Sequence, residues 1–327
     1  MKKLRRLAAV ALAAAMSLSL IACSNSGNPG GNGDSDNSGT PDYPKSVITM
    51  IVNYSAGGGT DLAARALADA AASEMGGTVT VQNVTGGNGT VGVTQLANSK
   101  ADGYTIGVAT LSPLALVPYQ LEVTYTPEDF EYICAFGQYG YGIVVAKDSP
   151  YKTLDDLIDA AKAGTVNFGA TGYPQPFAMA DLAEATGANF NYVNYASTTD
   201  LITDILGGFL PCAMADQASF AAYVESGDMR LLASAHNNRW EKAPDVPTLK
   251  EMGYDIEILS YMGMCVPAGT DEAIVQILRD AFEAAKDDPT YMEILENANL
   301  TWAYLSGDEY EALAKSEYAR YGELMAE

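Results

Sequence analysis

Residues 54–61 read Tyr-Ser-Ala-Gly-Gly-Gly-Thr-Asp and join the first strand-like run of the chain to its first strong helical run. The run before them, 47–52, is almost continuously apolar and β-branched, which is typical of a parallel strand buried on both faces. The run after them, 62–75, has apolar residues at helical spacing. We expect Thr60 or Asp61 to cap this helix. The glycines let a ligand approach backbone N–H groups that can hold an anion, and a purely structural turn is the alternative.

A succession of strand, small or polar turn and helix recurs along the chain. Further turns of this kind span residues 85–92, 170–176 and 195–200, and another begins at Asp216. Because strands and helices alternate over 327 residues, of which 48% are hydrophobic, the sequence predicts an α/β protein with two lobes. Ligands of open α/β sheets bind where such turns follow the strands, so these turns are the candidate binding loops.

The N-terminal residues predict export and anchoring. Residues 1–22 hold four basic side chains and no acidic one, and their apolar run is too short to span a bilayer comfortably. The run ends in Leu-Ile-Ala-Cys, which resembles the lipobox of bacterial lipoproteins. Cys23 is therefore the expected lipidation site, with an ordinary secretory signal as the alternative. Residues 23–43 are rich in Ser, Gly, Asn and Asp, as in a flexible tether.

Charge and cysteine content limit the possible partners. The formal net charge is −23, and loss of the basic leader would leave −27, which argues against nucleic acid or an anionic membrane surface as the partner of the folded part. Cys134, Cys212 and Cys265 stand in apolar runs without zinc-ligand spacing. We expect buried free thiols, and one disulfide is the alternative.

Formal matches to enzyme motifs are incomplete. Residues 87–92 fit Gly-x-Gly-x-x-Gly, but the next strand lacks the acidic residue that would hold a nucleotide ribose. Ser149 and Lys152 fit the Ser-x-x-Lys of penicillin-binding enzymes, but no Lys-Thr-Gly follows. No cofactor, metal or catalytic residue is therefore predicted, and a secreted lipoprotein hydrolase is the alternative function.

Short motifs occur in a defined order along most of the chain: Tyr43-Pro44-Lys45, Ser55 to Asp61, Thr85 to Gly89, Ala101 to Thr105, Tyr125 to Phe130, Asp204 to Gly208, Arg239-Trp240, Ala243 to Glu251 and Val266 to Thr270. No single motif is decisive. Together, their order and spacing resemble the extracytoplasmic substrate-binding proteins of tripartite tricarboxylate transporters, also called the Bug family, over nearly all of residues 44–327.

This resemblance implies a two-lobed α/β fold like that of periplasmic binding proteins of type II, a Venus flytrap with crossover strands as its hinge. Lobe 1 would comprise residues 44–142 plus 236–327, and lobe 2 would comprise residues 143–235. A protein of this family closes on a small carboxylate and delivers it to a membrane permease. We expect a monomer that works outside the cytoplasm and is not an enzyme.

The resemblance also implies the site. In lobe 1 the candidate ligand contacts are Tyr54, Ser55, Ala56, Gly57, Gly58, Thr60, Asp61, Gly86, Gly87, Asn88, Gly89 and Thr110. In lobe 2 they are Thr171, Gly172, Tyr195, Ala196, Ser197, Thr198 and Asp216. Residues 195–197 read Tyr-Ala-Ser where many members have Tyr-Lys-Gly, and residues 171–174 read Thr-Gly-Tyr-Pro where many have Ser-Gly-Val-Gly. These departures leave the ligand and its lobe 2 contacts open.

Several candidate side chains also have structural explanations. Asp61 could meet a ligand amine, but it also stands four residues before Arg65, as in an i,i+4 pair. Asp216 is either a ligand contact or a turn aspartate. His236 is the only histidine, so a histidine-based catalytic pair could form only there. The side chains of Tyr54, Tyr173 and Tyr195 could either cover a ligand or simply pack against the protein.

The candidate loops also predict the charge of the ligand. No Lys or Arg occurs in residues 54–61, 85–92, 110–119, 170–177, 195–200 or 216–220. Backbone N–H groups and helix N-termini can hold one carboxylate, but a third carboxylate would be buried without a partner. We therefore expect a mono- or dicarboxylate in preference to a tricarboxylate, with room for an amine near Asp61 or Asp216. The alternative is that other segments bring in Lys147 or Arg239.

Overall fold

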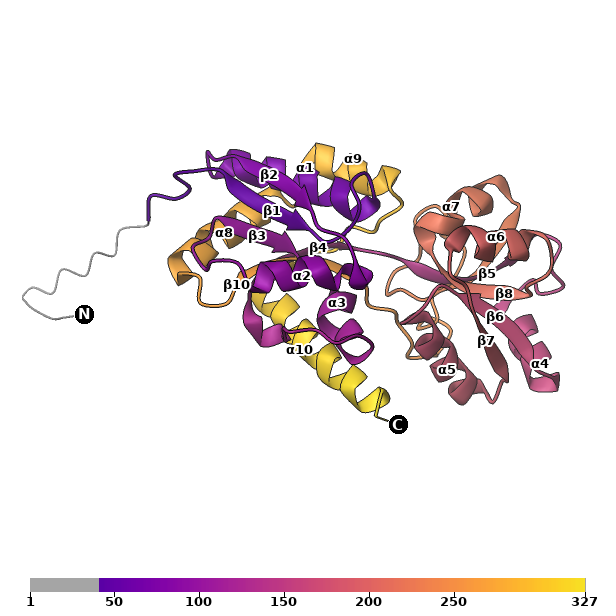
Figure 1. Cartoon of the computed structure of the whole chain (residues 1–327). Helices are drawn as coiled ribbons and strands as arrows, with labels where there is room; N and C mark the ends of the chain where they lie inside the picture. Colours follow the sequence, from indigo (N-terminus) through magenta and orange to yellow (C-terminus); the bar gives the residue numbers. More distant parts are fainter. Residues whose placement is uncertain (1–40, 327) are drawn as a thin grey trace, which may run out of the picture. The chain divides into compact units, whose positions relative to one another are not determined.

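The computed structural model describes residues 41–326. These residues form two β-sheets, each packed against helices (Figure 1). We call the six-stranded sheet with its helices lobe 1 and the five-stranded sheet with its helices lobe 2. The predicted targeting segment, Cys23 and nearly all of the tether lie outside the described residues. Within residues 41–326, none of the helices combines the length and apolarity that a membrane crossing requires.

Lobe 1 has a mixed sheet in the order β11-β4-β10-β3-β1-β2. Its strands are β1 (Ile48–Val52), β2 (Val79–Asn83), β3 (Thr105–Val108), β4 (Phe130–Gln138), β10 (Tyr261–Pro267) and β11 (Leu305–Ser306). The pairs β1–β2 and β1–β3 are parallel, whereas β10 runs antiparallel to both β3 and β4. The carboxyl ends of β1 and β3 therefore meet at one edge of the sheet.

Helices cover both faces of the lobe 1 sheet because β1 is apolar on both faces. Ile48, Met50 and Val52 join one core cluster, whereas Ile51 joins another. The first cluster includes residues of α1 (Gly59–Glu74), α8 (Glu272–Ala285) and α9 (Pro289–Asn297). The second includes residues of α2 (Thr90–Ala97), α3 (Leu111–Ala115) and α10 (Gly307–Leu324). Short 3₁₀ turns lie at Gly87–Gly89, Val117–Tyr119 and Pro127–Asp129.

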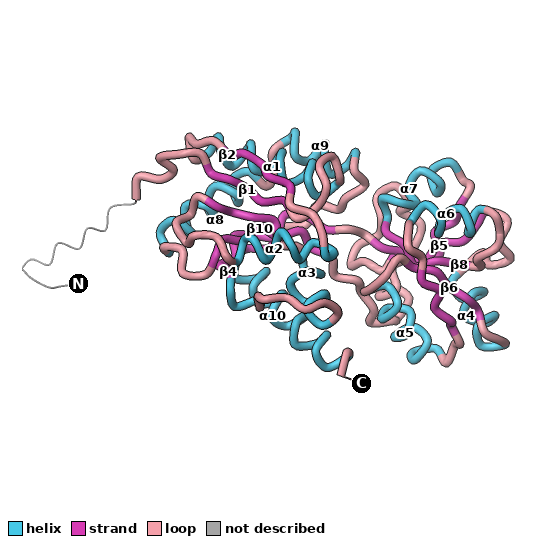
Figure 2. Tube along the Cα trace, in the orientation of Figure 1, coloured by secondary structure: helices cyan, strands magenta, loops and turns pink. Residues whose placement is uncertain are grey.

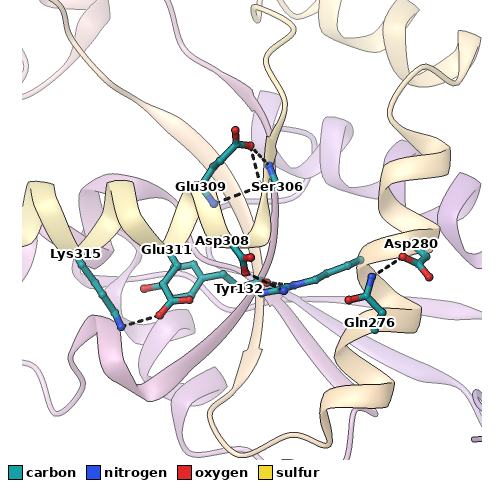
Figure 3. Close-up of polar contacts among 9 residues, drawn as sticks. Tyr132, Gln276, Asp280, Ser306, Asp308, Glu309, Glu311 and Lys315 are labelled. Atoms are coloured by element: carbon teal, nitrogen blue, oxygen red, sulfur yellow. Dashed lines mark hydrogen bonds and ion pairs between the residues drawn. The ribbon is translucent and has the colours of Figure 1, made fainter. Parts of the chain in front are cut away.

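The C-terminal helix α10 has a well-defined start. Ser306 and Glu309 form a capping box, in which the Ser306 side chain accepts from the Glu309 N–H and the Glu309 carboxylate accepts from the Ser306 N–H (Figure 3). Arg279 of α8 donates to the Tyr132 carbonyl at 2.9 Å and pairs with Asp308 at 3.0 Å. These contacts join α8, β4 and α10.

Lobe 2 has a mixed sheet in the order β7-β6-β8-β5-β9. Its strands are β5 (Tyr141–Ala146), β6 (Val166–Ala170), β7 (Phe190–Asn194), β8 (Cys212–Asp216) and β9 (Met229–Ser234). Its helices are α4 (Leu154–Ala163), α5 (Gln175–Thr186), α6 (Thr198–Leu206) and α7 (Gln217–Ser226). The β6–β7 and β6–β8 pairs are parallel, and β5 runs antiparallel to β8 and β9.

Two segments without helices link the lobes (Figure 2). Residues 139–140 join β4 to β5, and residues 235–260 join β9 to β10. The two links contact each other, because the Tyr139 N–H donates to the Ser260 carbonyl at 3.1 Å. The resemblance assigned residues from 236 onward to lobe 1. However, Trp240, Leu249 and Ile258 pack in the cores of lobe 2, so the packing places this part of the link with lobe 2.

Most elements agree with the sequence patterns. Runs 47–52 and 78–84 contain β1 and β2, and Thr153 and Asp156 form the expected capping box of α4. The cap of α1 was wrongly predicted, since its N-cap is Gly58, without a side-chain hydrogen bond, and Thr60 and Asp61 lie in its first turn. As expected, the three cysteines are buried free thiols. Burial raises the pKa of each thiol.

Candidate functional site

A cleft with a volume of about 490 Å³ lies where the strand ends of both lobes meet the links. Residues of the predicted site that line it are Tyr54, Asn88, Thr110, Thr171, Gly172 and Asp216. Each one follows a strand or ends it, except Asn88, which precedes α2. The cleft is therefore built at the carboxyl ends of strands, where the sequence predicted it.

The lobe 1 wall begins at the adjacent strands β1 and β3. Tyr54 follows β1 and Thr110 follows β3, and their hydroxyl groups lie 3.1 Å apart. Burial raises the pKa of Tyr54 to about 12 although the Thr110 hydrogen bond lowers it, so the phenol is a neutral donor at physiological pH. These hydroxyl groups can bond to a ligand oxygen without adding charge to the cleft.

The turn before α2 places Asn88 in the cleft through a left-handed backbone. Asn88 has φ 53° and ψ 35°, a conformation that Asn tolerates better than most residues. Gly89 has φ 95°, and a Cβ there would lie 2.8 Å from Asn53 Nδ2 and 2.9 Å from Pro113 Cγ. Glycine is thus required at this position by both its conformation and its close packing.

The start of α1 offers free N–H groups. No side chain caps it, and Gly58 is exposed. The Thr60 hydroxyl lies 2.9 Å from the Tyr139 hydroxyl of the first link. Because the first N–H groups of a helix have no partner within the helix, this end can accept an anion.

Asp61 is buried and serves the loop at the start of α1. Its carboxylate accepts from Arg65 Nε at 2.9 Å, from Asn83 Nδ2 at 2.7 Å and from the Gly57 N–H at 2.9 Å. Burial would raise the pKa of Asp61, but the hydrogen bonds from Arg65, Gly57 and Asn83 together lower it. Because these protein donors engage both oxygens, we place a ligand amine elsewhere.

The lobe 2 helices differ in their caps. Ser197 caps α6 by accepting from the Asp200 N–H at 3.2 Å, and Asp216 caps α7 by accepting from the Ser219 N–H at 3.0 Å. The N-cap of α5 is Pro174, which provides no side-chain hydrogen bond. Residues 171–175, before and at the start of α5, line the cleft. In lobe 2, the start of α5 is therefore the better anion site.

The remaining predicted residues lie outside this lining. The Tyr195 hydroxyl donates to Asp204 at 2.7 Å, and Gly57 and Gly58 are exposed. The whole set outside the lining is Ser55, Ala56, Gly57, Gly58, Thr60, Asp61, Gly86, Gly87, Gly89, Tyr195, Ala196, Ser197 and Thr198. Their contact with a ligand stays a prediction.

The electrostatics of the cleft are unusual for an anion site. Among the described residues that line it, none is Lys, Arg or His, and Asp216 is the one carboxylate. Burial raises the pKa of Asp216, and hydrogen bonds from Ser219 lower it in part. A carboxylate in this cleft would therefore have to be held by N–H groups, hydroxyl groups and helix ends.

Comparison with known proteins identifies the relatives of this chain. The model of the tripartite tricarboxylate transporter family receptor matches residues 63–327. The chain belongs to this receptor family. A UPF0065 protein from the gbd 5' region of Cupriavidus necator is 35% identical to the receptor, over 83% of this chain and 84% of that protein.

Solved structures show the same fold. A TctC solute-binding protein from Polaromonas, without ligand, is 30% identical to the receptor with a TM-score of 0.79, over 87% of this chain and 99% of that one. MatC from Rhodopseudomonas palustris with bound malate is 21% identical with a TM-score of 0.67, over 86% of this chain and 100% of that one. The predicted family and the predicted two-lobed α/β fold are thus confirmed.

Sequence reasoning missed part of the receptor's cleft. Tyr139, Tyr141 and Tyr261 come from or beside the links between the lobes, and Tyr321 comes from α10. The alternation Gln-Tyr-Gly-Tyr at residues 138–141 was a usable signal, because a segment that crosses between the lobes passes the cleft between them. Tyr321 gave no local signal. Its ring lies 5.7 Å from that of Phe177 on α5, a contact between residues far apart in the sequence.

The receptor has a second cavity, of about 780 Å³, that is larger than the cleft but is lined by none of the predicted ligand contacts. His236, Arg239 and Lys242 line it. Arg239 pairs with Glu251 at 2.8 Å, and Lys242 pairs with Glu225 at 3.1 Å. Since acidic side chains already neutralise these cations, the cavity is not the better anion site.

Three other suggestions from the sequence, namely Lys147, the pair of Ser149 with Lys152, and His236, lie outside the lining of the cleft. Lys147 lines a separate surface pocket near Ser149. The Lys152 ammonium donates to the Ser149 carbonyl at 2.6 Å rather than to its hydroxyl, so these residues do not form a base–nucleophile pair. His236 is buried, and its Nδ1 accepts from the Asn238 N–H at 3.3 Å. Burial lowers the pKa of His236.

Proposed function

We propose that this receptor captures a small carboxylate between its lobes and delivers it, unchanged, to a permease of the tripartite tricarboxylate type. The main observation that supports this proposal is the cleft, which is lined by residues at strand ends of both lobes. None of the described residues that line it is basic. Such a site suits one carboxylate on N–H and hydroxyl donors. Family membership supports the receptor role.

The proposal extends to location. The leader and the Leu-Ile-Ala-Cys sequence support a monomeric lipoprotein that is anchored through Cys23 outside the cytoplasm. The polar composition of residues 24–42 supports a tether between this anchor and the folded part, which would keep the receptor near its permease. Residues 1–40 lie outside the described range, so this part rests on the sequence.

The ligand class can be tested by direct binding. Native mass spectrometry of the purified protein would show any retained compound. A thermal-shift panel of mono-, di- and tricarboxylates and acidic amino acids, with malate among them, would then rank candidates. We expect a mono- or dicarboxylate to stabilise the protein most and to be recovered chemically unchanged. Conversion of the bound compound would favour the hydrolase, and strongest stabilisation by citrate would contradict the expected charge.

Gly58→Glu is expected to weaken carboxylate binding at least about 100-fold, or about 2.7 kcal/mol, and to leave the fold intact. The new carboxylate would occupy the N-terminus of α1 and repel the ligand. Gly58 has φ −74°, so the substitution adds no backbone strain. Calorimetry with the best compound of the panel measures the loss.

The matched control is Gly164→Glu. Gly164 is exposed at the end of α4 and has an extended φ of −171°, and a Cβ at this position would meet no atom within 4 Å. This variant has the same added charge far from α1 and should bind normally. Normal binding by Gly58→Glu as well would remove the start of α1 from the site.

Ligand is expected to close the lobes. A ligand shifts an equilibrium between open and closed forms only through contacts that it makes better in one of them, and the cleft has walls from both lobes. Small-angle scattering should show a smaller radius of gyration with saturating ligand. An unchanged radius would contradict capture by closure, even if calorimetry showed tight binding.

A further inference from the structure

The Asp216 carboxylate faces the cleft without a counter-charge. It ends β8 and caps α7, and its oxygens accept from the Ser219 N–H and from the Ser219 hydroxyl, each at 3.0 Å. Both donors are neutral. No Lys, Arg or His is among the described residues that line the cleft, so nothing there balances the charge of Asp216. A cation in the cleft could therefore pair with the Asp216 carboxylate, which is partly desolvated and has no other counter-charge.

Aromatic rings surround this acid. Tyr141 on β5 stands directly opposite Asp216 on β8 in the antiparallel register, so the two side chains lie on the same face of the sheet. Tyr139 lines the same cleft. Burial raises the pKa of both phenols, and the nearby charge of Asp216 raises them further. Rings of this kind attract a positively charged nitrogen through their faces.

Tyrosine is in fact the most common residue type in the lining. Tyr54, Tyr173, Tyr261 and Tyr321 also line the cleft, which makes six tyrosines in all. Groups of aromatic rings beside a carboxylate are a known way to hold ammonium and quaternary ammonium ions. Asp216, with Tyr139 and Tyr141 near it, thus provides both parts of a cation site.

The opposite part of the cleft suits an anion. In lobe 1, Tyr54, Asn88 and Thr110 line the cleft and offer neutral hydrogen-bond donors. One carboxylate there is favourable. A second carboxylate at the other end would meet Asp216, and like charges repel. Neutral donors in lobe 1 and the uncapped start of α5 can hold one carboxylate, whereas Asp216 favours a positively charged group.

We propose that the ligand of this receptor is a zwitterion, a carboxylate that also carries a positively charged nitrogen, with the nitrogen bound at Asp216 between Tyr139 and Tyr141. This inference rests on the proposed function, and it narrows the ligand class within it. Such a ligand is neutral overall, and its nitrogen balances the charge of Asp216. A dicarboxylate brings no charge that balances Asp216.

A matched ligand series tests the inference by calorimetry on the purified protein at neutral pH. The series comprises straight-chain carboxylates of three to six carbons that end in a methyl group, an ammonium, a trimethylammonium or a second carboxylate, together with the common α-amino acids. We expect a compound with a cationic nitrogen to bind at least tenfold more tightly than its methyl and carboxylate counterparts.

Asp216→Asn removes the charge and keeps the helix cap, because Asn and Asp are comparable N-caps. In this variant we expect the zwitterion to lose at least tenfold in affinity, while the methyl counterpart binds as before and the dicarboxylate binds no more weakly. The matched control is Asp155→Asn, which removes one exposed charge from the first turn of α4 outside the cleft. It should change none of these affinities.

The outcomes separate this inference from the proposed function. If dicarboxylates or plain monocarboxylates bind best, or if Asp216→Asn leaves the preference unchanged, the zwitterion is excluded and carboxylate capture stands. If no compound of the series binds the wild-type protein while other classes do, carboxylate capture itself is wrong and the inference fails with it.

Discussion

Gly263→Ala is expected to destabilise the protein by about 3 kcal/mol or more, enough to remove a large part of the stability of an ordinary domain. Gly263 lies in β10, between β3 and β4, and a Cβ there would overlap the ring of Tyr310. Tyr310 cannot move away easily, because it is fully buried and its hydroxyl donates to the Ala109 carbonyl at 2.6 Å. Its ring also packs edge-on against Tyr132, with centroids 5.5 Å apart.

Urea denaturation followed by circular dichroism measures this loss, and a low soluble yield would be an early sign of it. Gly164→Ala is the control, since its Cβ would meet no atom within 4 Å and its backbone is extended. This control should be neutral or slightly stabilising. If Gly263→Ala unfolded at the same urea concentration as the wild-type protein, the Tyr310 ring would have room to shift and the prediction would be wrong.

Asp61→Ala is expected to cost about 3 kcal/mol of stability at neutral pH, which corresponds to a fall of about 5–10 °C in Tm. The substitution leaves the Asn83 amide, the Gly57 N–H and the Arg65 guanidinium without their shared acceptor. Because Gly57 belongs to the loop before α1, ligand affinity should fall as well. Thermal melts and calorimetry on the same samples measure both effects.

The effect of Asp61 should depend on pH. Its pKa is lowered in the folded protein, so its contribution is fully present above the unfolded pKa, near about 4, and is lost as pH falls through the folded value. The difference in stability between wild type and Asp61→Ala should therefore be largest at neutral pH and shrink below about pH 4.

Asp69→Ala is the matched control for Asp61→Ala. Asp69 lies on the same helix but is exposed, and loss of an exposed charge changes stability by less than about 0.5 kcal/mol. If the two variants melt together, the network around Asp61 contributes nothing to stability. If the difference from wild type grows on acidification, the sign of the pKa shift is wrong.

Local patterns predicted most of the elements and the strand ends at which the cleft lies. The β-branched run at 47–52 became β1, and the capping box at Thr153 began α4. Tyr54, Thr110 and Thr171 line the cleft because each follows a parallel strand. The backbone hydrogen bonds and side-chain periods of helices and strands involve near neighbours, so they are visible in the sequence.

Tertiary packing alone decided which of the candidate residues line the cleft and which bond to other parts of the protein. The predicted pair of Asp61 with Arg65 is confirmed, whereas the hydrogen bonds that Asp61 accepts from Asn83 and Gly57 were not predicted. Ser197 faces its own helix and lies outside the cleft lining, whereas Tyr321 lies in it.

The physical reason is the range of the contacts. The runs that form β1 and α4 are read from residues a few positions apart, and the sequence by itself determined the strand–turn–helix order, the family and the absence of basic residues from the candidate loops. The bond between Tyr310 and Ala109 joins residues 201 positions apart. Contacts of this range leave no local pattern, so the fit of Gly263 to Tyr310 and the tyrosines around Asp216 were decided by the tertiary structure.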